Sequence, residues 1–245
     1  MAEPAPDTAQ PPDLREPRRE PIFNLPAIVV AIIALCVVIF LVEFYWLTDD
    51  QDYAFLVRAA FIPERYSGQY PIDIYAFTST VTYSLLHGGW PHLIINMVSL
   101  AAFGSPLANR LGAVRFILFW IVASIAAAGL QYVMNIGEGS YLVGASGAIS
   151  GMMGAAARFG FQIDRSTGRP GFAGPILPVR TVFGSRTVVS FLAIWMAVNL
   201  VTGLGSGIPG MDSQIAWEAH IGGFLVGFFG IALFDRRQPA GRRVP

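Results

Sequence analysis

Two side chains in this sequence have the types of a nucleophile and its base. Ser146 lies in the run Gly144-Ala145-Ser146-Gly147, and His220 lies in an apolar run further along the chain. A serine hydroxyl is a weak nucleophile until a base within hydrogen-bond reach takes its proton, and neutral imidazole is the usual base near pH 7. The pair therefore predicts acyl transfer by a Ser-His dyad, with Ser146 as the nucleophile and His220 as the general base.

A second pair, His92 and Asn96, has the types of oxyanion donors. The two residues are four apart, so they share one face of a helix, and both can donate to the oxygen of a tetrahedral intermediate. The backbone N–H of Ser146 at the start of a helix would add a third donor, favoured by the positive helix end. No carboxylate is positioned to complete a triad, because Glu218 lies two residues from His220 and so on another helical face.

The sequence offers no metal or cofactor site. Its one cysteine, Cys36, lies inside an apolar run, so neither a disulfide framework nor a cysteine-based metal site can be built. The G-x-S-G run is also not the G-x-S-x-G nucleophile elbow of an α/β hydrolase, since residue 148 is alanine. We therefore expect no metal and no cofactor in the reaction.

The elements that must position these residues are apolar enough to cross a membrane. The 245-residue chain is 54% hydrophobic and only 13% charged, and its mean hydropathy is +0.54, which is too apolar for an ordinary soluble domain. A hydrocarbon core of about 30 Å is crossed by about 20 apolar residues. Six runs meet or approach this length: Pro26 to Leu47, His92 to Ala108, Ala113 to Met134, Tyr141 to Gly160, Val188 to Leu204 and Ile215 to Phe234. The predicted fold class is an all-α membrane protein, a six-transmembrane-helix bundle over residues 26–235.

The arginines set the predicted orientation of the bundle. The chain has no lysine, and fourteen of its sixteen arginines lie on the side of the N-terminus if the six spans alternate. Only Arg58 and Arg65 lie on the other side, in a long loop rich in acidic residues. Because cytoplasmic loops carry the excess of positive charge, both termini are predicted to be cytoplasmic. Residues 1–25 are predicted to form a disordered tail and residues 236–245 a basic tail.

This topology brings the polar residues to a common depth. The second, fourth and sixth spans enter from the outer face, with His92 and Asn96 near one outer helix end, and Ser146 and His220 each about five residues inside their helices. Taken singly, a serine in a membrane helix usually bonds to a carbonyl one turn earlier, and a histidine can simply link helices. All three histidines, His87 included, fall in this outer layer or at its rim. Their joint placement favours a shared site.

Small residues are expected to bring two of these helices close together. The two stripes are Gly147, Gly151 and Ala155 on the fourth span and Ala219, Gly223 and Gly227 on the sixth. Stripes of this kind pack membrane helices through close backbone contact. They would also let the short side chain of Ser146 reach His220, so the packing role and the functional role are compatible.

Together the motifs resemble the rhomboid family of intramembrane serine proteases, over roughly residues 26 to 235. The resemblance rests on H-x-x-x-x-H-x-x-x-N from His87, G-x-S-G from Gly144 and A-H-x-x-G-x-x-x-G from Ala219, in that order. It implies a short fourth helix at the centre of the bundle, water access from the outer face and a transmembrane substrate that enters sideways. The roles it implies are Ser146 as nucleophile, His220 as its base, His92 and Asn96 as oxyanion donors, His87 as a supporting residue at the outer rim, and Gly144 and Gly147 as supporting glycines beside the nucleophile.

The chain departs from the family's pattern at three places. Residues 48–90 contain no Trp-Arg pair, Ala108 stands where many members have an acidic residue, and Ser150 stands where some have an aromatic that stacks on the base. None of these departures removes a group that does the chemistry.

The predicted function is that of an intramembrane serine endopeptidase that cleaves single-span transmembrane substrates near the outer membrane face. Its expected partners are transmembrane proteins and the lipid bilayer, with no nucleic acid. The absence of a transit peptide favours a multi-pass protein of a bacterial plasma (inner) membrane. The alternatives are a rhomboid-like substrate-binding protein without proteolysis and, third, a transporter, whose site would sit near the bilayer midplane between repeats that this sequence lacks.

Overall fold

The computed structural model describes residues 25–166, 168–204 and 216–235. Nearly all of the predicted N-terminal tail and the whole of the predicted basic tail lie outside the described residues. So does most of the glycine-rich connector from Gly203 to Gln214, which the sequence suggests as either a mobile cap over the site or a plain connector.

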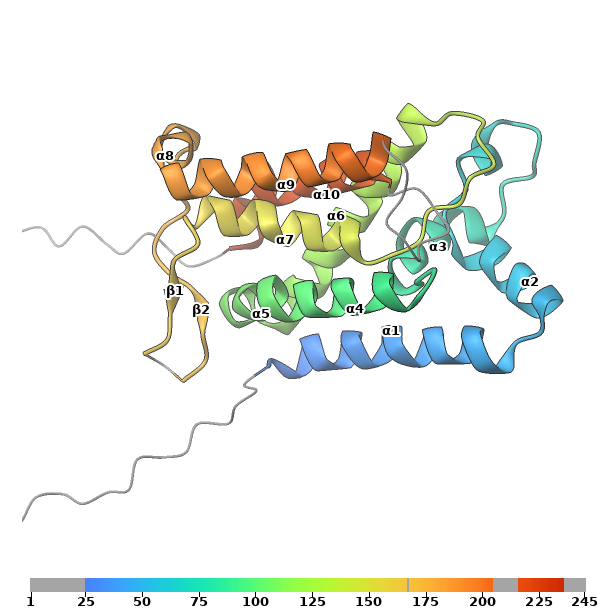
Figure 1. The fold of residues 1–245 in the computed structure, drawn as a ribbon, viewed down its shortest axis with the longest axis horizontal. Helices are drawn as coiled ribbons and strands as arrows, with labels where there is room; N and C mark the ends of the chain where they lie inside the picture. The colour runs from blue at the N-terminus through green and yellow to red at the C-terminus, as the bar shows by residue number, and fades with distance from the viewer. Residues whose placement is uncertain (1–24, 167, 205–215, 236–245) are drawn as a thin grey trace, which may run out of the picture.

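The described chain is a helical bundle with small elements at its two ends (Figure 1). The helices are α1 (Ala27–Trp46), α2 (Asp49–Ala59), η1 (Pro63–Tyr66), α3 (Ile74–Thr82), η2 (Tyr83–Leu85), α4 (Trp90–Ser99), η3 (Leu100–Gly104), α5 (Ser105–Leu111), α6 (Ala113–Met134), α7 (Ser146–Arg158), α8 (Val179–Gly184), α9 (Arg186–Leu204) and α10 (Trp217–Phe234). The strands β1 (Ile163–Asp164) and β2 (Gly171–Phe172) pair antiparallel, Ile163 opposite Phe172.

Five helical segments in the described residues are long and apolar enough to cross a membrane. They are α1, the continuous segment Trp90–Leu111, α6, α9 and α10. The second of these joins α4 to α5 through one π-helical turn, η3. The chain is therefore a multi-pass membrane protein, and its membrane-spanning part is all helical as predicted. The small hairpin β1–β2 lies at one end of the bundle, and α2 and α3 lie at the other (Figure 1).

The remaining predicted span, Tyr141 to Gly160, is helical over a shorter stretch than expected. Helix α7 begins only at Ser146 and has 13 residues, a length of about 20 Å. Helix α7 starts later than predicted because Leu142 exchanges two backbone hydrogen bonds with Phe61, with N···O distances of 2.8 and 3.2 Å. These hydrogen bonds hold the residues before α7 in an extended conformation. The prediction that Ser146 lies five residues inside its helix is therefore wrong: Ser146 is the first residue of α7.

Helix α7 is enclosed by its neighbours, and α10 packs closely along it. Nearly all of its residues from Gly147 onward are buried. A β-carbon added at Gly223 of α10 would lie 1.9 Å from the carbonyl oxygen of Gly147, and one added at Gly227 would lie 1.7 Å from that of Gly151. The two small-residue stripes meet as predicted, and no larger residue fits between the backbones.

The chain between α1 and α4 folds over one end of the bundle. Thr48 and Gln51 form a capping box at the start of α2, a pattern that satisfies free backbone N–H groups at a helix N-terminus. The guanidinium of Arg65 donates to the carbonyl oxygen of Val57 and to the hydroxyl of Ser79, the latter at 3.3 Å. This segment therefore has its own local anchor, although it lacks the Trp-Arg pair.

Candidate functional site

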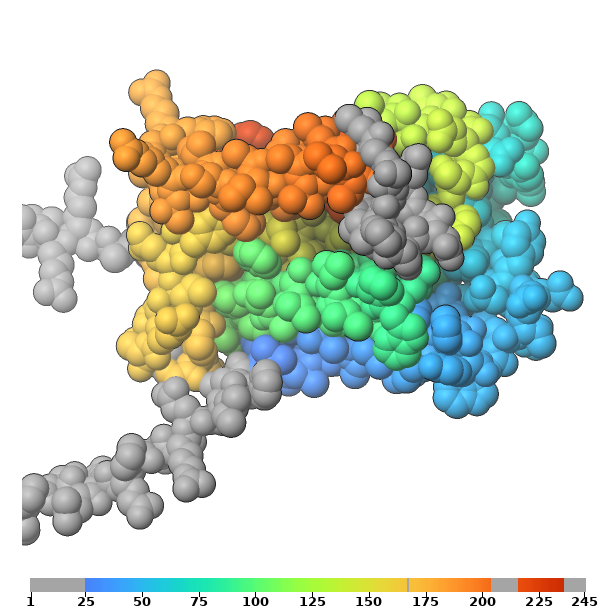
Figure 2. Space-filling model, in the orientation of Figure 1, coloured from blue at the N-terminus to red at the C-terminus, as the bar shows by residue number. Residues whose placement is uncertain are grey.

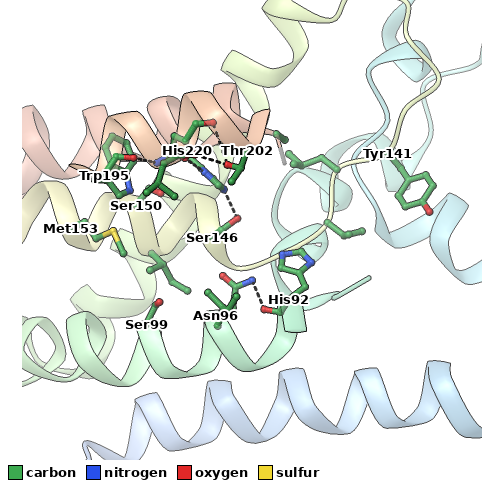
Figure 3. Close-up of a pocket in the computed structure, with 17 residues that line it drawn as sticks. His92, Asn96, Ser99, Tyr141, Ser146, Ser150, Met153, Trp195, Thr202 and His220 are labelled. Carbon is green, nitrogen blue, oxygen red and sulfur yellow. Dashed lines mark hydrogen bonds between the residues drawn. The ribbon is translucent and has the colours of Figure 1, made fainter. Parts of the chain in front are cut away.

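Ser146 and His220 lie within hydrogen-bond distance of each other. The hydroxyl oxygen of Ser146, at the start of α7, is 2.8 Å from Nε2 of His220, in the first turn of α10 (Figure 3). The contact follows from the packing below it, because the glycines at 147 and 223 bring the two helix backbones together. The structure thus joins two residues that lie 74 positions apart in the sequence.

The two side chains face a cavity of about 280 Å³. Its walls come from α4, α7 and α9 and from the extended segment before α7. Figure 2 shows the molecule hollowed between α4 and α9, with α7 lying deeper between them. Of the described residues that line this serine cavity, only His92, Tyr141 and His220 have titratable side chains, and none carries a carboxylate. The cavity is large enough for part of an extended peptide and is mostly apolar.

His92 and Asn96 line the wall opposite Ser146 (Figure 3). The amide nitrogen of Asn96 donates to the carbonyl oxygen of His92 at 3.0 Å. A side-chain amide has two N–H groups, so one of them is still available to a ligand in the cavity. The two residues share one face of α4, as their spacing of four predicts.

Gly144 connects this wall to the nucleophile. Its φ of +118° is a conformation that residues with a β-carbon rarely adopt, and a β-carbon there would lie 2.5 Å from Nε2 of His92. Its backbone N–H donates to the carbonyl oxygen of Tyr83 at 3.0 Å. Tyr83 is fully buried, and its hydroxyl donates to the carbonyl oxygen of Ser124 at 2.9 Å. The backbone turn before Ser146 is therefore held by the hydrogen bond to Tyr83 and by close packing against His92.

Gly147, on the other side of the nucleophile, is required for packing. A β-carbon there would lie 2.7 Å from the β-carbon of Ala127 and 3.2 Å from the Tyr83 hydroxyl. Close contacts therefore require glycine at both positions of the G-x-S-G run, in addition to any role of these residues in the chemistry.

His87 does not line the serine cavity, although the resemblance places it at the outer rim. Its side chain is 4% exposed, and its ring lies edge-on to that of His92 with centroids 5.1 Å apart. It borders a separate cavity of about 220 Å³ together with Glu43 and Asp52. Burial, and to a smaller extent the neighbouring His92, lower the pKa of His87 to about 3, while the backbone of Leu85 opposes this shift. His87 is therefore a neutral residue behind His92.

Asn199 is the residue at the site that sequence reasoning missed. Its side-chain oxygen Oδ1 is hydrogen-bonded to Nδ1 of His220, and its side chain is 5% exposed. The usual third member beside a Ser-His pair is a carboxylate, whereas Asn199 is an amide. A polar residue inside a predicted span was nevertheless visible, and such residues commonly mark function.

No metal site is found in the part of the chain that the structure describes. No three side chains of His, Cys, Asp or Glu among these residues are grouped so that they could hold a metal ion. The described groups at the site are the serine, the imidazoles and the amides, which suit proton transfer and hydrogen bonding.

Comparison with known proteins gives a consistent family. A family model described as the rhomboid domain matches residues 76–237. RHOMBOID-like protein 6, mitochondrial, from Arabidopsis thaliana is 32% identical over 150 residues, which is 60% of this chain and 40% of that protein. Rhomboid protease GluP from Bacillus subtilis is 28% identical over 148 residues, 60% of this chain and 24% of that protein. Putative rhomboid protease YdcA, also from Bacillus subtilis, is 27% identical over 172 residues, which is 64% of this chain and 69% of that protein. The chain spans about two fifths of the length of the first two plant relatives it matches.

Proposed function

Because this chain belongs to the rhomboid family, we propose that it is a serine endopeptidase that cleaves transmembrane proteins within the lipid bilayer. The observation that carries the proposal is the distance of 2.8 Å between the Ser146 hydroxyl and Nε2 of His220, beside a cavity of about 280 Å³. Two relatives with "protease" in their names, from Bacillus subtilis, support the same activity.

Peptide-bond cleavage follows from this pair in two halves. The Ser146 oxygen adds to the scissile carbonyl carbon while its proton passes to Nε2 of His220, and the carbonyl electron pair moves onto the oxygen. The C–N bond then breaks, His220 gives its proton to the leaving amine, and an ester joins the substrate to Ser146. Water next adds to the ester carbon and loses its proton to His220. The C–O bond to Ser146 breaks, and the proton returns to the serine.

The negative oxygen of each tetrahedral intermediate would be held by donors from two helices. The available N–H of Asn96 and the ring of His92 face the cavity from α4. The first backbone N–H groups of α7 have no acceptor within the helix, and the positive helix end favours a negative charge near Ser146. One such donor is typically worth about 10² to 10³ in rate.

The membrane arrangement of the protein is part of the proposal. We infer that α7, the fourth in chain order, is a membrane segment in addition to the other five, that both termini are cytoplasmic, and that the site lies near the outer face of a bacterial plasma membrane. The distribution of the arginines supports this orientation. Substrates would then be single-span proteins that meet the site from the bilayer.

Cleavage of a single-span reporter in liposomes tests the proposal against its alternative. The wild-type protein should cut the reporter, while Ser146→Ala and His220→Ala should each abolish cutting, because nucleophile and base act as a unit. Ser105→Ala, which removes a serine that does not line the serine cavity, serves as the matched control. Binding of the reporter by wild-type protein without any cleavage would favour the alternative, a rhomboid-like substrate-binding protein.

A further inference from the structure

The imidazole of His220 is held from two helices at once. Its Nε2 faces the Ser146 hydroxyl of α7, and its Nδ1 is hydrogen-bonded to Oδ1 of Asn199 of α9. Both ring nitrogens therefore have a partner, one on each side of α10. The Asn199 side chain is buried, so water does not compete freely for the hydrogen bond.

The orientation of the Asn199 amide follows from its second hydrogen bond. Its nitrogen Nδ2 donates to the backbone carbonyl oxygen of Trp195 at 2.7 Å. A carbonyl only accepts, so the NH₂ group must face Trp195 and the oxygen Oδ1 must face His220. Because Oδ1 also only accepts, Nδ1 of His220 must carry the ring proton. The lone pair is then on Nε2, the nitrogen that faces Ser146.

Packing above and below keeps Asn199 in this position. One turn away, the ring of Trp195 stacks on that of Phe224, with centroids 4.9 Å apart and planes 25° apart. On the other side, a β-carbon at Gly203 would lie 2.5 Å from the ring of Trp217. Residues 195, 199 and 203 are spaced by four along one face of α9. Asn199 and His220 are thus the polar pair between two tight contacts that fix the register of α9 against α10.

A neutral amide suits this place better than a carboxylate. An isolated charge in a buried membrane site is costly, and among the described residues that line the cavity no cation other than a histidine could pair with it. An amide oxygen orients the ring and selects its tautomer without adding a charge.

We propose that Asn199 is a positioning residue that holds His220 in the tautomer able to accept the proton of Ser146. The site would then work as Ser146-His220-Asn199, with the third residue supplied by α9. This inference rests on the proposed function, since the tautomer matters for catalysis only if Ser146 is the nucleophile.

The tautomer can be measured without any catalysis. The chain has only three histidines, so selective ¹⁵N-histidine labelling in detergent micelles gives three rings, assigned by substituting His87 and His92 in turn. In a Ser146→Ala background we expect Nδ1 of His220 to carry the proton. Adding Asn199→Leu should move the proton toward Nε2 or mix the two forms. An unchanged His220 spectrum in the Asn199→Leu variant would overturn the proposal.

The catalytic consequence is measured by the rate at which a fluorophosphonate labels the serine. Asn199→Leu should slow labelling by about 10²- to 10⁴-fold, the upper value being typical for loss of tautomer control in a serine triad. Val201→Ala, two residues away and 71% exposed, is the matched control and should label at the wild-type rate. A labelling rate of Asn199→Leu within twofold of that control would contradict the proposal.

Asn199→Asp separates positioning from plain packing. A carboxylate at this place also orients the ring, but it stabilises the imidazolium, so the variant should keep measurable labelling and its acid limb should move to higher pH. The titratable groups that line the cavity beside His220 are His92 and Tyr141, and both stay constant in this comparison. Equal losses in the Leu and Asp variants with an unshifted pH profile would assign Asn199 a structural role only. If the wild type itself is not labelled, the proposed function fails while the tautomer result still decides the role of Asn199.

Discussion

Gly223 of α10 lies so close to Gly147 of α7 that a β-carbon on the first would come within 1.9 Å of the carbonyl oxygen of the second. The two helices touch at their backbones one residue after Ser146 and three residues after His220. The reach of a short serine side chain to an imidazole on another helix therefore depends on a contact that only glycine allows.

Gly223→Ala is predicted to separate Ser146 from His220. The added methyl forces α10 away from α7, and overpacking of this kind costs about 1–3 kcal/mol of folding free energy. We expect lower thermal stability in detergent and a fall in cleavage rate of at least tenfold. Gly230→Ala is the matched control on the same helix, because a β-carbon there would meet only Val226, at 4.0 Å. A Gly223→Ala protein as active and stable as Gly230→Ala would contradict this account of the helix contact.

Asn96→Ala is predicted to slow the chemical step and leave substrate binding nearly unchanged. Removing one oxyanion donor typically lowers kcat by about 10²- to 10³-fold. The measurement is kcat and KM for reporter cleavage, with Val98→Ala as control, since Val98 is 65% exposed on the same helix. Wild-type kcat in both Asn96→Ala and His92→Ala would show that α4 does not stabilise the oxyanion.

His87 is predicted to make stability depend on pH. Its pKa in the folded protein is about 3 because of burial, whereas an unfolded histidine titrates near 6.5. The unfolded state therefore binds more protons between these values, so the neutral ring's contribution is complete above about pH 6.5 and falls as pH drops toward 3. Asp52 acts in the opposite sense, because burial and the nearby Asp49 raise its pKa.

Comparison of wild type with His87→Gln isolates this effect, since all other groups are common to both proteins. Between pH 7 and pH 5 the wild type should lose about 1–2 kcal/mol of unfolding free energy more than the variant, at 1.36 kcal/mol per pH unit of proton linkage. The measurement is thermal or denaturant unfolding in one detergent at both pH values. Parallel losses in the two proteins would show that His87 is not the titrating group.

Substrates are predicted to contain helix-weakening residues in the outer third of their span. A regular helix hides its carbonyl groups in its own hydrogen bonds, and unwinding in lipid is costly unless water or protein satisfies the backbone. A span carrying a Gly-Pro pair in its outer third should be cut near that pair, at a small residue such as alanine. Moving the pair to the inner third should abolish cleavage. Cutting that follows the pair to the inner side at an undiminished rate, mapped by mass spectrometry, would contradict a shallow site.

The sequence predicts the parts of the site that depend on spacing within one helix. Helical periodicity alone places His92 and Asn96 on one face and the glycines of α7 and α10 in stripes. Both features could therefore be predicted from the sequence. The start of α7 could not be predicted in this way, since it depends on the pairing of Leu142 with Phe61, which lie far apart in the sequence. The surroundings of His87 likewise depend on tertiary structure, since residues of α1 and α2 line the cavity that it borders.

Asn199 shows the same limit at the site itself. A single asparagine in an apolar helix predicts a polar contact, but its partner is set by the register of α9 against α10. That register comes from the contacts of Trp195 with Phe224 and of Gly203 with Trp217, which no periodicity in either helix specifies.

The most direct test of the account is to identify the residue that a fluorophosphonate modifies. The purified protein should be labelled on Ser146, as located by mass spectrometry, and labelling should disappear in Ser146→Ala and fall sharply in His220→Ala, while Ser105→Ala labels like the wild type. Labelling of another serine, or undiminished labelling of Ser146 when His220 is absent, would contradict the claim that Ser146 and His220 form the catalytic pair.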